Sequence, residues 1–431
     1  MQVLLNALIG VNLAVSVPLL FLGLFTCYWT TYAWHSPENF DETTFVSQRA
    51  GTSRFSFSVI VPVRDESLRV MSATIGCLLA QTHDRVQAVL SVGHDDPDTL
   101  DHAFALAKAD TTGRLTVSIS WSDVHNKPTQ LNAALSSCTG DIVGLLDAES
   151  LSAPDLLSGV DTVFQQTGVS VVQGGVTLTN YRSSWVSLRS ALEYYAHHRS
   201  KMHFSAARDA ILMGGNTVFF KRSLLEELGG WDESNLAEDA EISLRLLSLG
   251  HSVTVAYDPN LVSKEEAPVT MRAWVKQRTR WNLGFLQTIS KGVWRELPGR
   301  QRRLALWHLL QPSLMSFTGL VFPLSVLSYF LCHPPLALAM LTWVPLVPTV
   351  LAVVIECVLL RSFTHDHGSQ PARVRDYVKV VLSTPIYQMM LSVSAIRAAV
   401  KFRRGDFRWD KTMHEGRHLV DGDVQLVEVA A

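Results

Sequence analysis

The sequence has few cysteines, and no two of them lie close together. Its 431 residues contain five, and none forms a C-x-x-C pair. Disulfide frameworks and zinc sites need paired or closely spaced cysteines, so both are disfavoured, and a reducing environment is the simpler expectation. The five are Cys27, Cys77, Cys138, Cys332 and Cys357.

An excess of either charge is also missing. Lysine and arginine total 37 against 39 aspartates and glutamates, which gives no global case for binding nucleic acid. No internal repeat stands out, and no low-complexity segment is present. Hydrophobic residues make up 47% of the chain, and the mean hydropathy is +0.16. We therefore expect one soluble domain combined with membrane helices.

The N-terminal region predicts a membrane anchor. Residues Val3–Trp29 are almost unbroken apolar sequence of spanning length, and aromatic residues typical of a membrane interface follow. The alternative is a cleaved signal peptide, which is disfavoured because no Lys or Arg precedes the run and no clear cleavage site follows. We assign residues 1–34 to a transmembrane anchor and 35–54 to a linker. Arg49 and Arg54 then weakly favour a cytoplasmic position for the next domain.

Residues 55–270 predict an α/β domain. Apolar strand-like runs alternate with helical spacing, which is typical of a parallel sheet whose ligands bind beyond the carboxyl ends of the strands. The predicted strands are Phe57–Val61, Val86–Val92, Leu115–Ser120 and the run that starts at Ile142; the predicted helices are Leu68–Leu79, Leu100–Ala109, Thr129–Leu135, Trp185–His203 and Ala237–Leu249.

Acidic residues follow several of these strands. The run from Ile142 ends at Asp147 and Glu149, which point the same way if the backbone stays extended. Two neighbouring carboxylates suit Mg²⁺ or Mn²⁺, and such an ion can hold a diphosphate. The alternative is a solvated turn before Pro154. Similar acids follow two other strands, at Asp65-Glu66 and at Asp95-Asp96.

Three later segments carry further polar candidates. Glu193, His197 and His198 could suggest a metal site, but H-E-x-x-H is absent. The glycines before Asn216 permit close approach of another molecule to the backbone. Glu238-Asp239 opens a helix, where acids usually just complement the helix dipole.

The C-terminal part predicts further membrane association. We assign 271–312 to interfacial helices, 313–400 to membrane helices and 401–431 to a basic cytosolic tail. Ser313–Cys332 and Leu336–Leu360 are spanning runs. Both flanks of Val380–Val400 are basic, and the positive-inside bias would place both on the cytoplasmic side. This segment is then interfacial or re-entrant, unless the bias does not hold here. We favour the interfacial position. Glu356 faces a polar path or sits near the interface.

These motifs together resemble membrane-bound family-2 glycosyltransferases, the group that contains cellulose, hyaluronan and poly-N-acetylglucosamine synthases. The resemblance runs from about Phe55 to Trp281 and more loosely to the tail. Its elements occur in the family order. They are Val61-Pro62-Val63-Arg64-Asp65-Glu66, Asp95-Asp96, the segment from Asn126 to Leu135, Asp147-Ala148-Glu149 at the D-x-D position, Gly215-Asn216, Glu238-Asp239, Gln277-Arg278-Thr279-Arg280-Trp281 as Q-x-x-R-W, and Trp409-Asp410-Lys411-Thr412.

The resemblance implies a GT-A (nucleotide-diphospho-sugar transferase) fold, an α/β Rossmann-like domain flanked by transmembrane helices, and transfer that inverts the anomeric centre. The implied catalytic residues are Asp239 as general base, Glu238 and Arg280. Asp147 and Glu149 are the implied ligands of Mg²⁺ or Mn²⁺. Donor binding is implied for Asp65, Glu66, Asp95, Asp96, Lys127, Asp147 and Arg278, and acceptor binding for Gly215, Asn216, Gln277 and Trp281.

The implied partners are a nucleotide-sugar donor, with UDP as the family's usual nucleotide, a glycan or lipid-linked acceptor and the membrane; an accessory export subunit is left open. The expected protein is a multi-pass enzyme of the cell membrane with a cytoplasmic catalytic domain. The leading hypothesis is a processive polysaccharide synthase that moves its product across the membrane. Its rivals are transfer of a single sugar to a lipid acceptor and a catalytically inactive scaffold. Glu149 departs from the usual second Asp, Pro128 follows Lys127 where the family has small residues, and the membrane part is short for a complete channel.

Overall fold

The computed structural model describes residues 2–36, 53–332, 336, 340, 343–368, 370–408, 416, 418 and 419. Most of the predicted linker, and the tail motif Trp409 to Thr412, lie outside the described residues.

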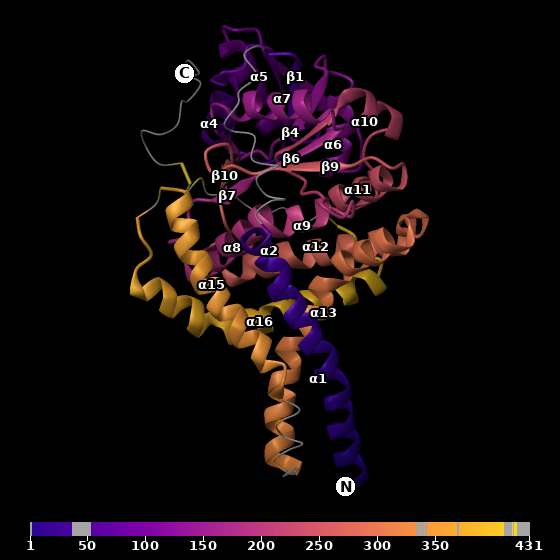
Figure 1. Ribbon diagram of the computed structural model, residues 1–431. Coiled ribbons are helices and arrows are strands. Elements are labelled where there is room, and N and C mark those ends of the chain that lie inside the picture. The colour runs from indigo at the N-terminus through magenta and orange to yellow at the C-terminus, as the bar shows by residue number, and fades with distance from the viewer. Residues whose placement is uncertain are drawn as a thin grey trace.

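A seven-stranded mixed sheet forms the centre of the domain, in the order β3-β2-β1-β4-β8-β6-β9 (Figure 1). Strand β1 pairs in parallel with both β2 and β4, whereas β8 runs antiparallel to β4 and β6. The predicted parallel-rich α/β fold is therefore confirmed, with one reversed strand in the sheet. The bounds are β1 Phe57–Val63, β2 Val86–Gly93, β3 Leu115–Ser120, β4 Ile142–Leu145, β6 Val171–Gly174, β8 Val218–Lys221 and β9 Val253–Ala256.

Helices cover both faces of this sheet because its central strands are apolar on both sides. Val59 and Val61 of β1 face one hydrophobic core with α4, α5 and α7, while Ile60 faces a second core with α6, α10 and α11. Together they make three layers with the sheet in the middle. The bounds are α4 Leu68–Leu79, α5 Pro97–Ala109, α6 Lys127–Leu135, α7 Leu156–Thr167, α10 Arg222–Leu228 and α11 Glu238–Ser248.

A small second sheet adjoins the end of β4. Strand β10 pairs antiparallel with β5 and parallel with β7. The segment predicted as one helix, Trp185–His203, is helical throughout but changes its repeat: α8 ends at Ala196, and a π-helical turn, His197–Lys201, leads directly into α9. The bounds are β5 Leu151–Ser152, β7 Val176–Leu178, β10 Ser263–Glu265, α8 Trp185–Ala196 and α9 Met202–Ala206.

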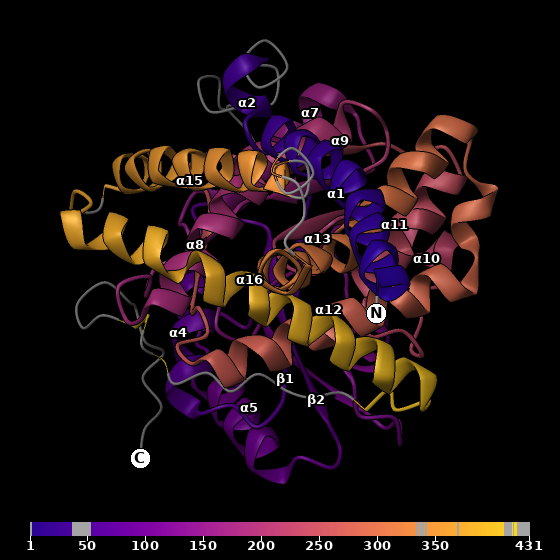
Figure 2. The ribbon, with the colours of Figure 1, turned by 90° about the horizontal axis from the view of Figure 1, so that it is seen from below.

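Long helices form a layer below the sheet domain. In Figure 1, α1 and α13 project side by side from the body, and Figure 2 shows α12 and α16 running across their direction. Helix α16 is continuous through Pro385, without a re-entrant turn, and packs against Trp274 of α12. The bounds are α1 Gln2–Thr30, α2 Tyr32–His35, α12 Met271–Lys291, α13 Gly299–Cys332, α15 Leu346–Asp366 and α16 Val374–Arg403.

Two segments of the predicted membrane part can be compared with the helices of the structure. Helix α13 continues through residue 312, where the sequence predicted a change from interfacial to spanning helix. Helix α15, Leu346–Asp366, covers the C-terminal part of the predicted span Leu336–Leu360, and residues 337–339 and 341–342 of that span lie outside the described residues. Among the described residues, α15 is the one helix both long and apolar enough to cross a membrane; the described apolar part of α1, Ala14–Thr30, is shorter.

Candidate active site

A cavity of about 550 Å³ lies between the carboxyl end of β4, the start of α11 and helix α12. It brings together most of the residues that the sequence singled out, although they lie far apart along the chain. The predicted site residues that line it are Glu66, Lys127, Asp147, Glu149, Gly215, Asn216, Glu238, Asp239, Gln277, Arg278, Arg280 and Trp281.

Lys127 joins two sides of this cavity. Its Nζ lies 2.5 Å from Asp147 Oδ1, donates to the carbonyl of Gly215 at 2.7 Å, and lies 3.8 Å from Glu238 Oε1. Burial alone would lower the pKa of Lys127, but the carboxylates of Asp147 and Glu238 outweigh it, so the net pKa is raised. The lysine is therefore a fixed positive charge between the two groups of acids.

The carboxylates of Asp147 and Glu149 come together in a turn and not on an extended strand. Strand β4 ends at Leu145, and Ser150 N donates to Asp147 O at 3.0 Å. One carboxylate oxygen each from Asp147, Glu149 and Glu265 lies within 4.8 Å of the others. Ser150 Oγ positions Glu265 with a 2.7 Å hydrogen bond. Three carboxylate oxygens so close together match the hard ligands that Mg²⁺ and Mn²⁺ prefer.

Glu238 and Asp239 begin α11 on the opposite side of the cavity. A Cβ placed on Gly215 would lie 3.2 Å from Glu238 Oε1 and 3.3 Å from Asp239 Oδ2, so both carboxylates face this glycine. Burial, more than repulsion by Asp239, raises the pKa of Glu238 to about 7. Burial also raises the pKa of Asp239, although Lys127 and Arg280 oppose this effect. A carboxylate with a raised pKa is suited to accept a proton near neutral pH.

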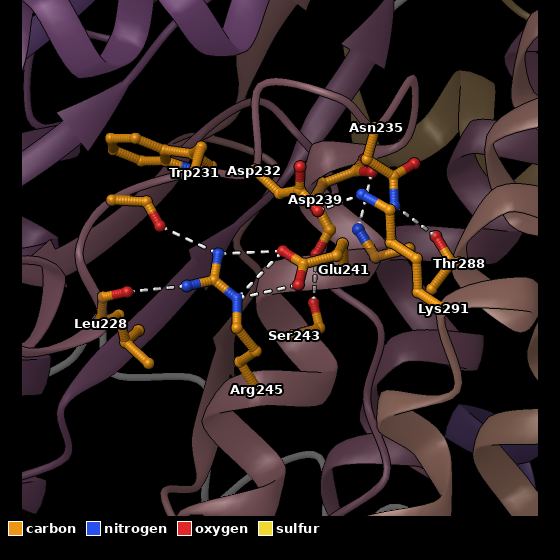
Figure 3. A network of polar contacts seen from close by, with 12 residues as sticks. Leu228, Trp231, Asp232, Asn235, Asp239, Glu241, Ser243, Arg245, Thr288 and Lys291 are labelled. Carbon is orange, nitrogen blue, oxygen red and sulfur yellow. Dashed lines mark hydrogen bonds and ion pairs between the residues drawn. The ribbon is translucent and has the colours of Figure 1, made fainter.

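Hydrogen bonds fix the loop that leads into α11 (Figure 3). Arg245 Nη1 donates to Leu228 O at 2.8 Å, and its Nε donates to Glu241 Oε1 at 2.9 Å. Asn235 Nδ2 donates to Thr288 Oγ1 of α12 at 2.9 Å. The start of α11 is therefore held from its own helix and from α12.

Helix α12 also packs directly against this loop at Gly284. A Cβ on Gly284 would lie 2.6 Å from the backbone nitrogen of Ala237, the residue before Glu238. Only glycine permits this approach, which sets the distance between α12 and the two acids.

The arginines of α12 differ in their surroundings. Arg280 Nε is buried and has no hydrogen-bond partner among the described residues, and its positive charge lowers the pKa of both Glu238 and Asp239. Arg278 forms an ion pair with Glu193 of α8, and its guanidinium lies 4.2 Å from the ring centroid of Trp281. Arg280 is therefore the arginine available to a ligand beside the acids.

The acids that follow β1 and β2 lie outside the cavity lining, apart from Glu66. Asp95 forms a bidentate pair with Arg64, at 3.1 and 2.5 Å, and this hydrogen bonding lowers its pKa. Asp96 caps α5 by accepting from Thr99 N, and also accepts from Asp65 N at 2.7 Å. Because Arg64 itself lines the cavity, Asp95 is connected to it through one side chain.

The sequence interpretation missed Glu265. It lies 116 residues after Glu149 on the very short strand β10, where no periodic pattern marks a strand. The adjacent acids Glu265-Glu266 before Pro268 were the available signal. Glu193 was considered as a metal ligand, but in the structure it pairs with Arg278.

Comparisons with known proteins find glycosyltransferases similar to this chain. The β-monoglucosyldiacylglycerol synthase of Trichormus variabilis is 26% identical over 66% of this chain and 61% of its own length. The poly-β-1,6-N-acetyl-D-glucosamine synthase of Staphylococcus epidermidis is 23% identical over 48% of this chain and 49% of its own length. The chain thus spans about half to three fifths of these curated relatives.

The fold also matches a solved structure. A mannosyltransferase from Pyrobaculum calidifontis, in complex with GDP-Man and Mn²⁺, superposes with a TM-score of 0.62 at 19% identity, over 92% of this chain and 99% of that one. This similarity shows the GT-A fold. The model of the family described as glycosyltransferase like family 2 matches residues 54–284, which is more than half of the chain. The chain belongs to glycosyltransferase family 2.

Proposed function

We propose that this chain is an inverting hexosyl- or N-acetylhexosaminyltransferase that moves a sugar from a nucleoside-diphosphate donor to a lipid acceptor presented at a membrane. The observation that carries the proposal is the single cavity lined by Asp147, Asp239 and Arg280, with Lys127 between the acids. Burying several charged groups together lowers the stability of a protein, and a catalytically inactive scaffold would gain no activity that offsets this loss.

Asp239 is the proposed general base. An acceptor hydroxyl beside Gly215 would transfer its proton to Asp239 as its oxygen attacks the anomeric carbon, and the nucleoside diphosphate leaves from the opposite face. Arg280 and Lys127 stabilise the negative charge that develops on that leaving group. Glu238 raises the negative potential at Asp239, and Trp281 offers an apolar face for a sugar ring.

Asp147, Glu149 and Glu265 are the proposed holders of a divalent cation, because their oxygens form the compact set described above. When bound, Mg²⁺ or Mn²⁺ supplies positive charge for the donor diphosphate. Mn²⁺ in the mannosyltransferase complex supports this assignment. Its GDP-Man donor supports a nucleotide sugar as donor but leaves the base undetermined. Glu66, Asp65, Asp95, Asp96 and Arg278 remain proposed donor-side residues, with Arg64 linking Asp95 to the cavity.

The proposal of a lipid acceptor rests on the extent of the cavity. Its lining continues from Asp239 to Thr26 of α1, Gln311 of α13 and Ile355 of α15, so one space joins the acids to the long apolar helices. The similarity to a diacylglycerol glucosylating enzyme supports the same class of acceptor. We infer that these helices sit in the cell membrane, with the sheet domain on its cytoplasmic side.

Processive polysaccharide synthesis is the second candidate. Gln277 and Trp281 of the Q-x-x-R-W motif line the cavity, where they could hold the acceptor end of a glycan together with Gly215 and Asn216. The similarity to a poly-N-acetylglucosamine synthase supports it. Such an enzyme would need a longer channel, which an accessory export subunit could complete.

Radiolabelled nucleotide sugars, incubated with membranes that contain the full chain, test both candidates. Products with a single added sugar that extract into organic solvent support lipid transfer, and long glycans support the polymerase. Asp239→Asn should abolish transfer and leave nucleotide binding intact. Lost nucleotide binding in Asp239→Asn would move Asp239 to the donor site, and full activity would refute its role as base.

A further inference from the structure

The part of the cavity farthest from the sheet carries an unbalanced positive charge. We call it the helix-layer end, and it is lined by Thr26, His197, Lys201, His308, Gln311 and Glu356. It is enclosed by α1, α13, α15 and the π-helical turn after α8, and it is continuous with the space beside Asp239.

Two of the three cations around this end have carboxylate partners. Arg189 pairs with Glu356 at 2.5 Å, and Arg278 pairs with Glu193. Lys201 is the third cation, and no carboxylate lies within 4.0 Å of its Nζ among the described residues. Its charged group instead lies 5.2 Å from the ring centroid of Trp29. The two ion pairs are neutral, so these five charged side chains together carry one net positive charge, which lies on Lys201.

The surroundings hold Lys201 in this position. Trp29 Nε1 of α1 donates to the carbonyl of Lys201 at 2.9 Å, and Ala33 N donates to Ser200 Oγ at 3.0 Å. The π-helical turn adds one residue to the helical repeat, and such turns are frequent at functional sites. These contacts from α1 and α2 anchor the turn and keep the lysine at the cavity wall.

His197, His308 and Gln311 offer hydrogen bonds at this end, while the carboxylates of Glu193 and Glu356 act on Lys201 only from beyond ion-pair distance. Burial lowers the pKa of His197 well below its usual value, so this imidazole is neutral at physiological pH. His308 stacks on Trp29 with ring centroids 5.0 Å apart, and Gln311 lies one helical turn further along α13. Burial lowers the pKa of Lys201 by more than Glu193 and Glu356 raise it, and this is the cost of holding a cation there without an ion-pair partner. An anionic ligand would remove that cost.

We propose that the helix-layer end binds the phosphoryl group of an anionic lipid acceptor, with Lys201 as its counter-ion and His197 and Gln311 as hydrogen-bonding partners. This inference rests on the proposed function and narrows its substrate to a phospholipid whose head group also carries a hydroxyl. The acyl chains would lie along α1, α13 and α15, and the hydroxyl would point toward Asp239. That hydroxyl oxygen bonds to the anomeric carbon, its proton goes to Asp239, and the nucleoside diphosphate leaves.

Two lipids that differ in charge provide the test. Phosphatidylglycerol and diacylglycerol both have a free hydroxyl, but only the first has a phosphodiester. With the full chain in phosphatidylcholine nanodiscs, we expect transfer to favour phosphatidylglycerol. Lys201→Met should raise the KM for phosphatidylglycerol at least about tenfold, because a buried counter-ion is lost, with the donor KM unchanged. Lys201→Arg should restore most of the affinity, and Lys108→Met on the exposed surface is the matched control.

Binding without turnover separates this inference from the proposed function. Native mass spectrometry of the Asp239→Asn variant should detect bound phosphatidylglycerol. Adding Lys201→Met to this variant should remove the bound lipid. Neither result depends on finding a donor that supports transfer. A chain that transfers sugar with no preference between the lipids would overturn the anionic acceptor and leave the glycosyltransferase intact. Inorganic phosphate that binds in a Lys201-dependent way, with no retained phosphatidylglycerol, would overturn the lipid assignment.

Discussion

Replacing Glu238 with glutamine should stabilise the protein, and by an amount that depends on pH. Glu238 is buried at the start of α11 beside Asp239, and its pKa is raised from the ordinary 4.5 to about 7. Between these values the folded protein binds a proton that the unfolded chain has released, so stability falls as pH rises. The rise of this pKa from 4.5 to about 7 corresponds to a penalty of about 3 kcal/mol above pH 7, at ~1.4 kcal/mol for each pH unit.

The glutamine variant lacks this penalty because it cannot ionise. At pH 4 the carboxyl is protonated in both the folded and the unfolded state, so the difference in stability between variant and wild type at this pH serves as the reference. Between pH 4 and pH 8 that difference should change by about 3 kcal/mol in favour of the variant. Urea unfolding in detergent, followed by tryptophan fluorescence at several pH values, measures the difference. Glu227→Gln, at an exposed position on α10, is the control and should show no such trend.

Two results would refute this reasoning. One is a stability difference between Glu238→Gln and the wild type that does not change with pH. The other is a variant that becomes less stable relative to the wild type as the pH rises from 4 to 8, which would mean that the attraction of Lys127 for Glu238 outweighs the cost of burial.

Three further predictions concern the groups around this pair. Gly284→Ala should lower stability by about 1–3 kcal/mol and reduce activity, because the added methyl group meets the Ala237 backbone; Gly299→Ala, with open space around it, should do neither in the same thermal and activity assays. Glu265→Gln should weaken activation by Mn²⁺ by about 10- to 100-fold in a metal titration of initial rates, and unchanged activation would remove Glu265 from the metal site. Lys127→Met should move the acidic limb of the kcat/KM profile to higher pH, because the lysine charge lowers the pKa of both Glu238 and Asp239; a limb at the same pH would contradict that coupling.

Local patterns in the sequence were sufficient for the α/β domain. The apolar runs of β1, β2 and β4 are buried on both faces, and such runs are recognised without knowledge of their neighbours. Helix α4 has the predicted bounds, Leu68–Leu79, and α5 begins three residues earlier than predicted, at Pro97, because Asp96 caps it. Helix α13 runs without a break through Pro312, the last residue that the sequence analysis assigned to the interfacial helices.

The sequence also determined which acids follow the strands, since strand ends are marked by a local change from apolar to polar residues. Only the tertiary structure decided which of them share a cavity. Asp147 faces the site, whereas Asp96 is occupied as a helix cap, and no local pattern separates these two outcomes.

Tertiary pairing alone brought Glu265 to Asp147 and Glu149. The pairing of β10 with β5 joins segments separated by more than one hundred residues, and such contacts depend on the whole path of the chain. The same holds for Lys201, which has no carboxylate within ion-pair distance among the described residues, because Glu356 of α15 and Glu193 of α8 pair with Arg189 and Arg278. Charge in a sequence can be counted, but whether a buried charge has a partner is decided only when distant helices pack together.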